Sequence, residues 1–189
     1  MPREDAAIHP WLYHNSIPLA HVQAGNGFDD LRMGSHGPDE YLRTFYVQRQ
    51  DSTDVVITNS DPQVQVPTGY KQMNLMQKVR FRPNDRWDFQ YGFHYSTTSD
   101  YSRYDRLIRT KNGLPRSAEW YYGPQIWMMN NLQLTVRNNN RLFDEVRMIA
   151  AWQNYSESRH DRNFGKISVN EQFEKVDALS SNSAFDKKT

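Results

Sequence analysis

The chain has 189 residues, a formal net charge of +1 and no cysteine. This balance of charge gives no general case for nucleic-acid binding, and the lack of cysteine excludes disulfides and thiolate metal sites. Hydrophobic residues make up only 37% and the mean hydropathy is −0.90, which is low for a packed core, whereas aromatic residues reach 13%. A polar chain rich in rings suits a single-layer β-barrel, in which half of each strand is polar and rings gather at the membrane interfaces.

The N-terminal segment, residues 1–27, is weakly patterned and remains unassigned. It contains three histidines, His9, His14 and His21. Their spacing matches no metal-ligand motif, so we expect a solvated segment there and not a metal site. No signal peptide is visible, because the first five residues include Glu4 and Asp5 and no apolar region follows them. No apolar run approaches the ~18 residues of a membrane-spanning helix. Gly25–Gly27 indicates a turn, and residues 28–33 could form a short strand.

Residues 34–69 predict a long excursion that contains one hairpin. Residues 41–50 alternate loosely between apolar and polar, and Val55, Val56 and Ile57 follow a polar Asp-Ser-Thr-Asp turn. Two prolines and a glycine then break the pattern before residue 70, where the main hairpin is expected to begin.

The clearest pattern in the chain is a hairpin formed by residues 70–82 and 87–96, joined by the turn Pro83–Arg86. In the second strand every odd position from 87 to 95 is aromatic and every even position is polar or glycine. Because side chains alternate across a strand, one face carries a ladder of rings and the other face is polar. Residues 70–82 alternate in the same way, with Met76 and Gln77 as exceptions.

This alternation fits two architectures. In a membrane barrel the apolar residues face lipid: Leu75, Val79, Phe81, Trp87, Phe89, Tyr91, Phe93 and Tyr95. The polar ones then face the lumen: Lys78, Arg80, Gln90 and His94. In a soluble sandwich the same apolar face packs on a second sheet. Periodicity alone does not separate the two.

Residues 97–122 form a connection too long for a tight turn, and they interleave arginine with aromatic residues. Long ordered loops tend to carry function, and guanidinium groups and rings can together bind an anionic ligand or nucleic acid. The candidate ligand-facing residues are Arg103, Tyr104, Arg106, Arg109, Trp120 and Tyr121. The simpler interpretation is that ion pairs and ring stacking hold this loop to itself.

The C-terminal part predicts a second hairpin, with strands at residues 125–137 and 142–155 around an asparagine turn at 138–140. A charged second long loop is expected at 156–167, followed by a weakly alternating strand at 168–186. Short turns would then alternate with long connections along the chain. Outer-membrane barrels have this asymmetry, with short periplasmic turns and long extracellular loops, whereas a soluble sandwich has no reason to sort its loops in this way.

Several stretches resemble the barrel of TonB-dependent outer-membrane receptors of the kind common in Bacteroidetes. They are Tyr70-Lys-Gln-Met-Asn-Leu-Met-Gln-Lys-Val-Arg-Phe-Arg-Pro83, Trp87-Asp-Phe-Gln-Tyr-Gly-Phe-His-Tyr-Ser96, Tyr104-Asp-Arg-Leu-Ile108 with Asn112-Gly-Leu-Pro-Arg116, and Glu119-Trp-Tyr-Tyr-Gly-Pro-Gln125 with Trp127-Met-Met-Asn-Asn-Leu132. The similarity runs from about residue 28 to the C-terminus. It implies an all-β, antiparallel meander that is part of a transmembrane β-barrel of roughly 22 strands around a plug.

The resemblance also implies a function: active uptake, across the cell outer membrane, of a substrate too large for porins. Residues 28–189 would be a partial barrel domain, an internal fragment of about seven to nine strands that does not transport alone. Plug, TonB-contacting segment and barrel-closing strand are not recognised in it. The implied partners are outer-membrane lipid, the remainder of the receptor (plug and other strands), the TonB complex acting through the plug, and a substrate that could be an iron chelate, vitamin, peptide or glycan.

No hydrolase elbow, phosphate loop or zinc-protease motif is present, so an enzyme is not expected, and neither is a cofactor or metal. The alternative hypothesis is a soluble all-β module that binds a ligand or glycan, in which the same Trp and Tyr side chains would stack on sugars. The two hypotheses differ in whether the ring ladder is left uncovered or is buried under a second protein layer.

Overall fold

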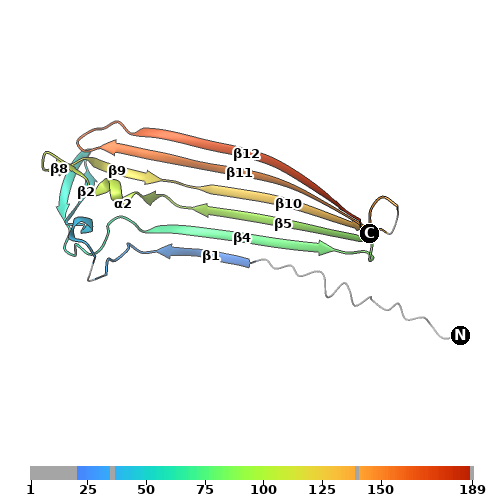
Figure 1. Ribbon diagram of the computed structural model, residues 1–189. Coiled ribbons are helices and arrows are strands. Elements are labelled where there is room, and N and C mark those ends of the chain that lie inside the picture. Colours follow the sequence, from blue (N-terminus) through green and yellow to red (C-terminus); the bar gives the residue numbers. More distant parts are fainter. Residues whose placement is uncertain (1–20, 35–36, 139–140, 188–189) are drawn as a thin grey trace.

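The computed structural model describes residues 21–34, 37–138 and 141–187, and it shows an antiparallel all-β fold built on one eight-stranded sheet (Figure 1). Neighbouring strands follow the order β1-β4-β5-β10-β11, with β9 and β6 beyond β11 and with β12 also paired to β11. The strands of this sheet are β1 (His21–Phe28), β4 (Tyr70–Phe81), β5 (Trp87–Thr98), β6 (Tyr101–Ser102), β9 (Ser117–Tyr122), β10 (Ile126–Arg137), β11 (Glu145–Asn163) and β12 (Asn170–Asp186).

The remaining elements are short and lie at one end of the sheet, at the left of Figure 1. They are η1 (Asp39–Tyr41), the hairpin β2 (Phe45–Gln50) and β3 (Thr53–Thr58), the single-turn helix α2 (Tyr104–Leu107), and the hairpin β7 (Thr110–Lys111) and β8 (Leu114–Pro115). The turns β4–β5 and β10–β11 lie at the other end. Within the described residues the sheet does not close on itself, because β1 and β12 are not paired to each other.

The predicted main hairpin is confirmed as β4 and β5, in a register that places Phe81 opposite Phe89 and Arg80 opposite Gln90. Its turn is stabilised by Asn84, whose Oδ1 accepts hydrogen bonds from the backbone N–H of Arg86 (3.0 Å) and Trp87 (3.1 Å). An asparagine side chain that accepts hydrogen bonds from the backbone two and three residues later stabilises a reversal of the chain. The next strand can therefore begin at residue 87.

The sheet has two chemically different faces. We call the side that carries Trp87, Phe89, Tyr91, Phe93 and Tyr95 the ring face, and the opposite side the polar face. Cross-strand partners extend the ring face across the sheet in rows, because directly opposite residues point to the same side. The rows are Trp87–Val136–Val146–Phe185, Phe81–Phe89–Leu134–Met148–Ser183, Val79–Tyr91–Leu132–Ala150–Ser181 and Gln77–Phe93–Asn130–Trp152–Leu179.

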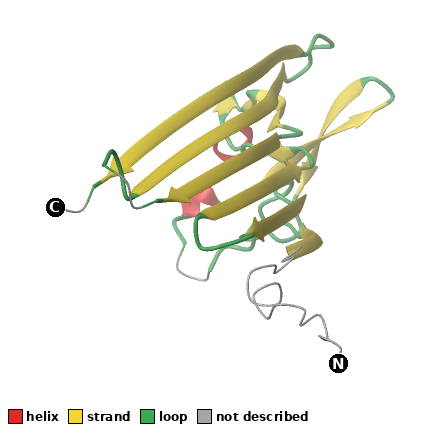
Figure 2. Cartoon of the chain, turned by 90° about the vertical axis from the view of Figure 1, so that its right-hand side faces the viewer, coloured by secondary structure: helices red, strands yellow, loops and turns green. Residues whose placement is uncertain are grey.

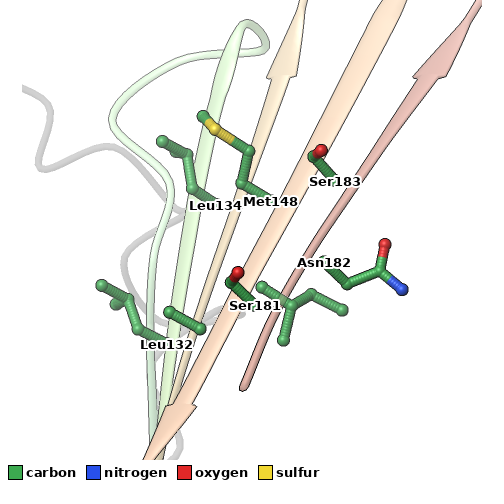
Figure 3. Close-up of a pocket in the computed structure, with 8 residues that line it drawn as sticks. Leu132, Leu134, Met148, Ser181, Asn182 and Ser183 are labelled. Carbon is green, nitrogen blue, oxygen red and sulfur yellow. The ribbon is translucent and has the colours of Figure 1, made fainter. Parts of the chain in front are cut away.

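Much of the ring face is exposed. Phe81 is 52% exposed and Leu132 is 51% exposed, although both lie in regular strands of the sheet. Figure 3 shows Leu132, Leu134 and Met148 projecting together on one side of β10 and β11, where they line an open hollow of about 390 Å³, while Asn182 points the other way. In Figure 2 the strands of the main sheet form a single layer. No described element packs over these rows.

A conventional apolar core is correspondingly small. Among the described residues, the hydrophobic side chains that are buried are Leu107, Ala118 and Val146. Among the described residues, buried positions are more often polar or charged than hydrophobic, as with Arg43, Asp88 and Arg162. The fold therefore depends on strand pairing and polar networks more than on a two-layer hydrophobic interior.

The polar face carries the residues that the alternation assigned to it, including Lys78, Gln90 and His94. Its most buried group is Asp88, 2% exposed, whose carboxylate accepts hydrogen bonds from Arg80 Nε (2.9 Å) and Nη2 (2.5 Å). This two-point contact between a guanidinium and a carboxylate fixes the β4–β5 pair on the polar side.

Several sequence expectations are corrected. The strand expected at 28–33 is not formed: β1 ends at Phe28, and only an isolated bridge joins Arg32 to Val64. Gly25–Gly27 lies within β1 and not in a turn, at an irregularity in its register with β4. Residues 156–163 are not loop but the last part of β11, so only residues 164–169 connect β11 to β12. The predicted hairpin within 41–58 is confirmed as β2 and β3.

None of the helices in the described ranges has the length and apolar character needed to cross a bilayer.

Candidate functional site

The candidate site lies at the end of the sheet that carries the irregular elements. Two long connections meet there: residues 29–69 between β1 and β4, and residues 99–125 between β5 and β10. Three buried or half-buried arginines organise this end: Arg162 of β11 binds the first connection, Arg43 joins the two connections to each other, and Arg103 donates to the Tyr122 hydroxyl of β9.

Arg162, at the end of β11, joins three elements. Its guanidinium donates to Asp54 Oδ2 of β3 (2.7 Å) and to Glu119 Oε1 of β9 (2.6 Å from Nη2). The side chains of Arg162 and Asp54 are 3% and 1% exposed. The hydrogen bond from Arg162 lowers the pKa of Asp54 to about 2, with further bonds from the Gly165 N–H and from Arg49 acting in the same direction against the effect of burial.

Arg43 secures helix α2 to the 29–69 connection. Its Nη1 donates to the carbonyl of Leu107 (2.7 Å) and its Nε to the carbonyl of Val66 (2.7 Å). Burial lowers the pKa of Arg43. Tyr104, one of the predicted ligand-facing residues, belongs to this anchor, since its hydroxyl donates to the carbonyl of Tyr41 and its ring lies 5.9 Å from the Arg43 guanidinium.

An arginine–aromatic cluster forms around Trp120 of β9. The guanidinium carbon of Arg103 lies 5.2 Å from the Trp120 ring centroid, and those of Arg106 and Arg159 each lie 5.8 Å from it. Such cation–π contacts are attractive when the ring is partly shielded from water. The structure brings together Arg103, Arg106 and Trp120 from the predicted ligand-facing set, and it adds Arg159 from β11.

One carboxylate serves several of these arginines. Asp105 accepts from Arg103 Nε (2.7 Å) and lies 3.6 Å from Arg106 Nε and 3.8 Å from Arg109 Nη2. The hydrogen bond with Arg103 lowers the pKa of Asp105 and raises the pKa of Arg103. Positive charge therefore exceeds negative charge around Asp105.

Beside this cluster is a small hollow of about 100 Å³, which we call the arginine hollow. It is lined by Arg106, Arg109, Arg116, Ser117, Trp120, Asp161 and Asn163. The strand register places Trp120 opposite Asp161 and Tyr122 opposite Arg159, so these side chains share one face of the sheet. That face is the polar face, because Arg159 and Asp161 alternate in phase with Tyr155, which is opposite Trp127.

A second, larger hollow of about 310 Å³ lies on the same face, and we call it the aromatic hollow. It is lined by Tyr70, Gln72, Ser96, Thr98, Tyr101, Gln125, Trp127 and Tyr155. A hydrogen-bond network organises one wall: the Gln125 amide donates to Tyr101 (2.9 Å) and to Glu157 (2.7 Å), which also accepts from the Tyr155 hydroxyl (2.6 Å). The alternation pattern of single strands does not reveal this hollow, because its lining comes mainly from strands β4, β5, β6, β10 and β11, which only the sheet register brings together.

Tyr121 is placed apart from the other predicted ligand-facing residues. It alternates with Trp120, so it lies on the opposite side of β9 and stacks on His160 at 4.8 Å between ring centroids. Phe173 of β12 then meets His160 edge-on at 5.9 Å. Tyr121 thus packs on His160, on the same side of the sheet as the ring face, and it does not line the arginine hollow.

Across the described parts of the chain, no group of three or more His, Asp or Glu side chains is arranged to hold a metal ion. His9 and His14, two of the three N-terminal histidines, lie outside the described residues.

Comparison with known proteins finds no match for this chain among family models, curated proteins or solved structures.

Proposed function

We propose that this chain is a segment of the wall of an outer-membrane β-barrel of the TonB-dependent receptor type, which acts in substrate uptake together with the rest of that receptor. In this proposal the ring face contacts lipid, and the polar face lines the lumen. The observation that carries the proposal is the separation of charge between the two faces of a single-layer sheet.

The separation is sharp over the height of the sheet nearest the short turns. None of the ring-face positions in the four rows from Trp87 to Gln77 carries a charge, across β4, β5, β10, β11 and β12. The same stretches of strand place Lys78, Arg80, Asp88 and Arg147 on the polar face. These four rows span seven residues along each of β5, β10, β11 and β12, and on β12 the uncharged band ends at Asp177 in the next row. On β5 and β10 the uncharged ring-face positions continue to Thr97 and Ile126, so the band is eleven residues tall there. About nine to eleven residues of a tilted strand match the hydrocarbon thickness of a bilayer.

Connection lengths support the same orientation. Residues 82–86 and 138–144 connect strands at one end, while the two long connections, residues 29–69 and 99–125, lie at the other end together with the short connection 164–169. In outer-membrane barrels short connections are periplasmic and long ones extracellular. The arginine and aromatic hollows would then lie on the lumen side near the extracellular mouth, where an incoming substrate first meets the barrel.

The exposed edges also favour a larger assembly. All residues of β12 are exposed, and this strand is paired only with β11 among the described residues. A long unpaired edge is a template for another strand. In the proposed receptor that strand belongs to the remainder of the barrel, with the plug and the TonB complex as the further partners.

The competing function is a soluble all-β module that binds a ligand or glycan. The aromatic hollow is the observation that favours it, because rings of Trp127, Tyr155 and Tyr101 lie there beside amide and hydroxyl groups. That function requires the ring face to be stable in water. Contiguous exposed apolar surface of this kind is unusual for a soluble monomer.

Tryptophan quenching by lipid tests the proposal. Trp152 lies on the ring face within the uncharged band, whereas Trp127 lies on the polar face. Two variants, each retaining one of these tryptophans with the other four Trp changed to Phe, are reconstituted into vesicles of lipid with brominated acyl chains. We expect the bromines to quench Trp152 strongly and Trp127 weakly, and aqueous acrylamide to quench Trp127 preferentially.

Circular dichroism of both variants checks that the β-structure is retained. A chain that remains monomeric in buffer without detergent, or equal quenching of the two tryptophans by the bromines, would contradict the barrel proposal and favour the soluble module.

A further inference from the structure

The two hollows on the polar face are connected by a row of aromatic rings. Tyr70, in the aromatic hollow, lies 6.1 Å from Tyr101 between ring centroids, and Tyr101 lies 5.6 Å from Tyr122. Tyr122 in turn meets Trp120, which lines the arginine hollow, edge-on at 5.0 Å. The hollows are therefore two ends of one continuous surface.

Hydrogen-bonding capacity is unused at the arginine end. Within the described residues, the guanidinium groups of Arg106 and Arg116 donate no side-chain hydrogen bond that meets normal geometry, and Arg159 donates one, to Gln172. Arg106 faces Asp105 only at 3.6 Å, beyond hydrogen-bond distance. Arg109 donates its Nε to the backbone carbonyl of Asp105 and not to a carboxylate (3.0 Å).

The carboxylates nearby do not balance these arginines. Asp105 is shared by Arg103, Arg106 and Arg109, and Asp161 already accepts a hydrogen bond from the amide of Asn170 (3.0 Å). Guanidinium groups present planar donors that match carboxylate, phosphate and sulfate oxygens. A hollow with excess arginine and spare donors is therefore suited to an oxyanion.

The aromatic end has a different character. Gln72, Ser96, Thr98 and Gln125 place amide and hydroxyl groups among the rings of Trp127 and Tyr155. Rings accept the flat face of a sugar or of an aromatic group, and the amides and hydroxyls can bond to its substituents.

We propose that this surface binds an anionic ring compound, whose carboxylate, phosphate or sulfate lies in the arginine hollow and whose ring stacks on the aromatic row. The proposal rests on the proposed function in one respect: in a barrel the surface faces the lumen, so this compound is the substrate class of the receptor. Two sources share the chemistry, an acidic sugar and an aromatic acid.

Titration of the full chain in detergent tests it. The probes are digalacturonate (an acidic sugar), its neutral digalactose counterpart, salicylate (an aromatic acid) and inorganic phosphate, with binding followed by calorimetry and by the fluorescence of a variant that retains only Trp120. We expect at least one of the acidic ring probes to bind more tightly than both the neutral sugar and phosphate, and its affinity to fall as salt is added. Whichever acidic probe binds identifies the source.

The decisive variant is Arg106→Gln with Arg116→Gln, which removes two charges from the arginine hollow. Its matched control is Arg82→Gln with Arg86→Gln, which removes two charges at the opposite end of the sheet. Loss of charge-assisted contacts should weaken the acidic probe by about tenfold or more in the first variant, and leave it within about twofold of wild type in the control. Tyr101→Leu, which removes a ring that belongs to the aromatic row and also lines the aromatic hollow, should weaken the acidic ring probe but not phosphate.

Three results would overturn the proposal: no binding of either acidic probe, equal loss in both arginine variants, or phosphate bound as tightly as the ring probes. The outcome of this titration and that of the lipid-quenching experiment are independent of each other. Arginine-dependent binding by a chain that is not inserted in lipid would retain this site and reject the barrel, whereas insertion without such binding would reject only the site.

Discussion

At the scale of single residues, the buried pair Asp54–Arg162 decides how the β2–β3 hairpin attaches to the sheet. Neither residue stands out in the sequence, because they are 108 positions apart. A buried charge whose partner is removed is strongly destabilising, since the remaining charge has lost both water and its counterion. The attachment is therefore more sensitive to this pair than to the exposed ion pairs of the surface, which contribute little.

Replacing Asp54 with Asn should loosen the hairpin, at a cost of about 3 kcal/mol, because Arg162 then retains only Glu119 as a carboxylate partner. Amide hydrogen exchange in β2 and β3 measures the change. The matched control is Asp51→Asn in the exposed β2–β3 turn, which should leave exchange almost unchanged. Equal protection in the two variants would show that the ion pair does not hold the hairpin.

The same pair predicts a pH dependence. The pKa of Asp54 is lowered to about 2 in the folded protein from an ordinary value of 3.8, so its stabilising effect is complete above pH 4 and is lost as the pH falls towards 2. The loss amounts to about 2 kcal/mol. Hydrogen exchange of β2 and β3 at a series of pH values, corrected for intrinsic rates, should show this loss in wild type and not in Asp54→Asn.

At the scale of elements, each long strand carries one apolar and one polar series of side chains. In β10 the two series predict different effects of an added arginine on stability. Leu132 is 51% exposed on the ring face, next to Gln133 on the polar face. In water, an arginine at an exposed position of a strand would change stability little. In lipid, an arginine at the middle of the bilayer costs about 2–4 kcal/mol.

Leu132→Arg should therefore destabilise the chain in vesicles by about 2–4 kcal/mol, while Gln133→Arg, one residue away, should have an effect within about 0.5 kcal/mol. Denaturant unfolding from lipid vesicles measures both. The same small effect for the two variants would indicate that water, and not hydrocarbon, bathes the ring face.

The element scale also shows where sequence patterns fail. Residues 156–163 read as a charged loop because Glu157, Arg159, Asp161 and Arg162 interrupt the apolar alternation. They are strand because β9 and β12 pair with them on both sides and because their charges find partners across those strands, such as Glu119 for Arg162. Tertiary pairing overrides a composition typical of loops.

At the scale of the whole molecule, the sheet is an open single layer that has β1 at one edge and β12 at the other in the described residues. Its inner strands, such as β5 and β10, are paired on both sides. β12 presents 17 residues with one side unpaired. This uneven pairing makes the edge the part of the molecule most dependent on its surroundings.

Amide exchange should report this difference. In the chain alone, in detergent, alternate amides of β12 should exchange at least about a hundredfold faster than those of β10, because only every second N–H of an edge strand points to its partner. Rates measured at several chain concentrations separate an open edge from one covered by a second copy. Uniform protection of β12 at low concentration would contradict an open sheet.

The sequence by itself determined the all-β class, the β4–β5 and β2–β3 hairpins, and which side chains of β4, β5 and β10 share a face, because a period of two is a local property of an extended backbone. Only the tertiary structure decided that β11 continues to Asn163, that Arg159 joins Arg103, Arg106 and Trp120, and that two hollows lie along one polar face. These features depend on the pairing of β11 with both β9 and β10, and that register is a property of strands far apart in the chain.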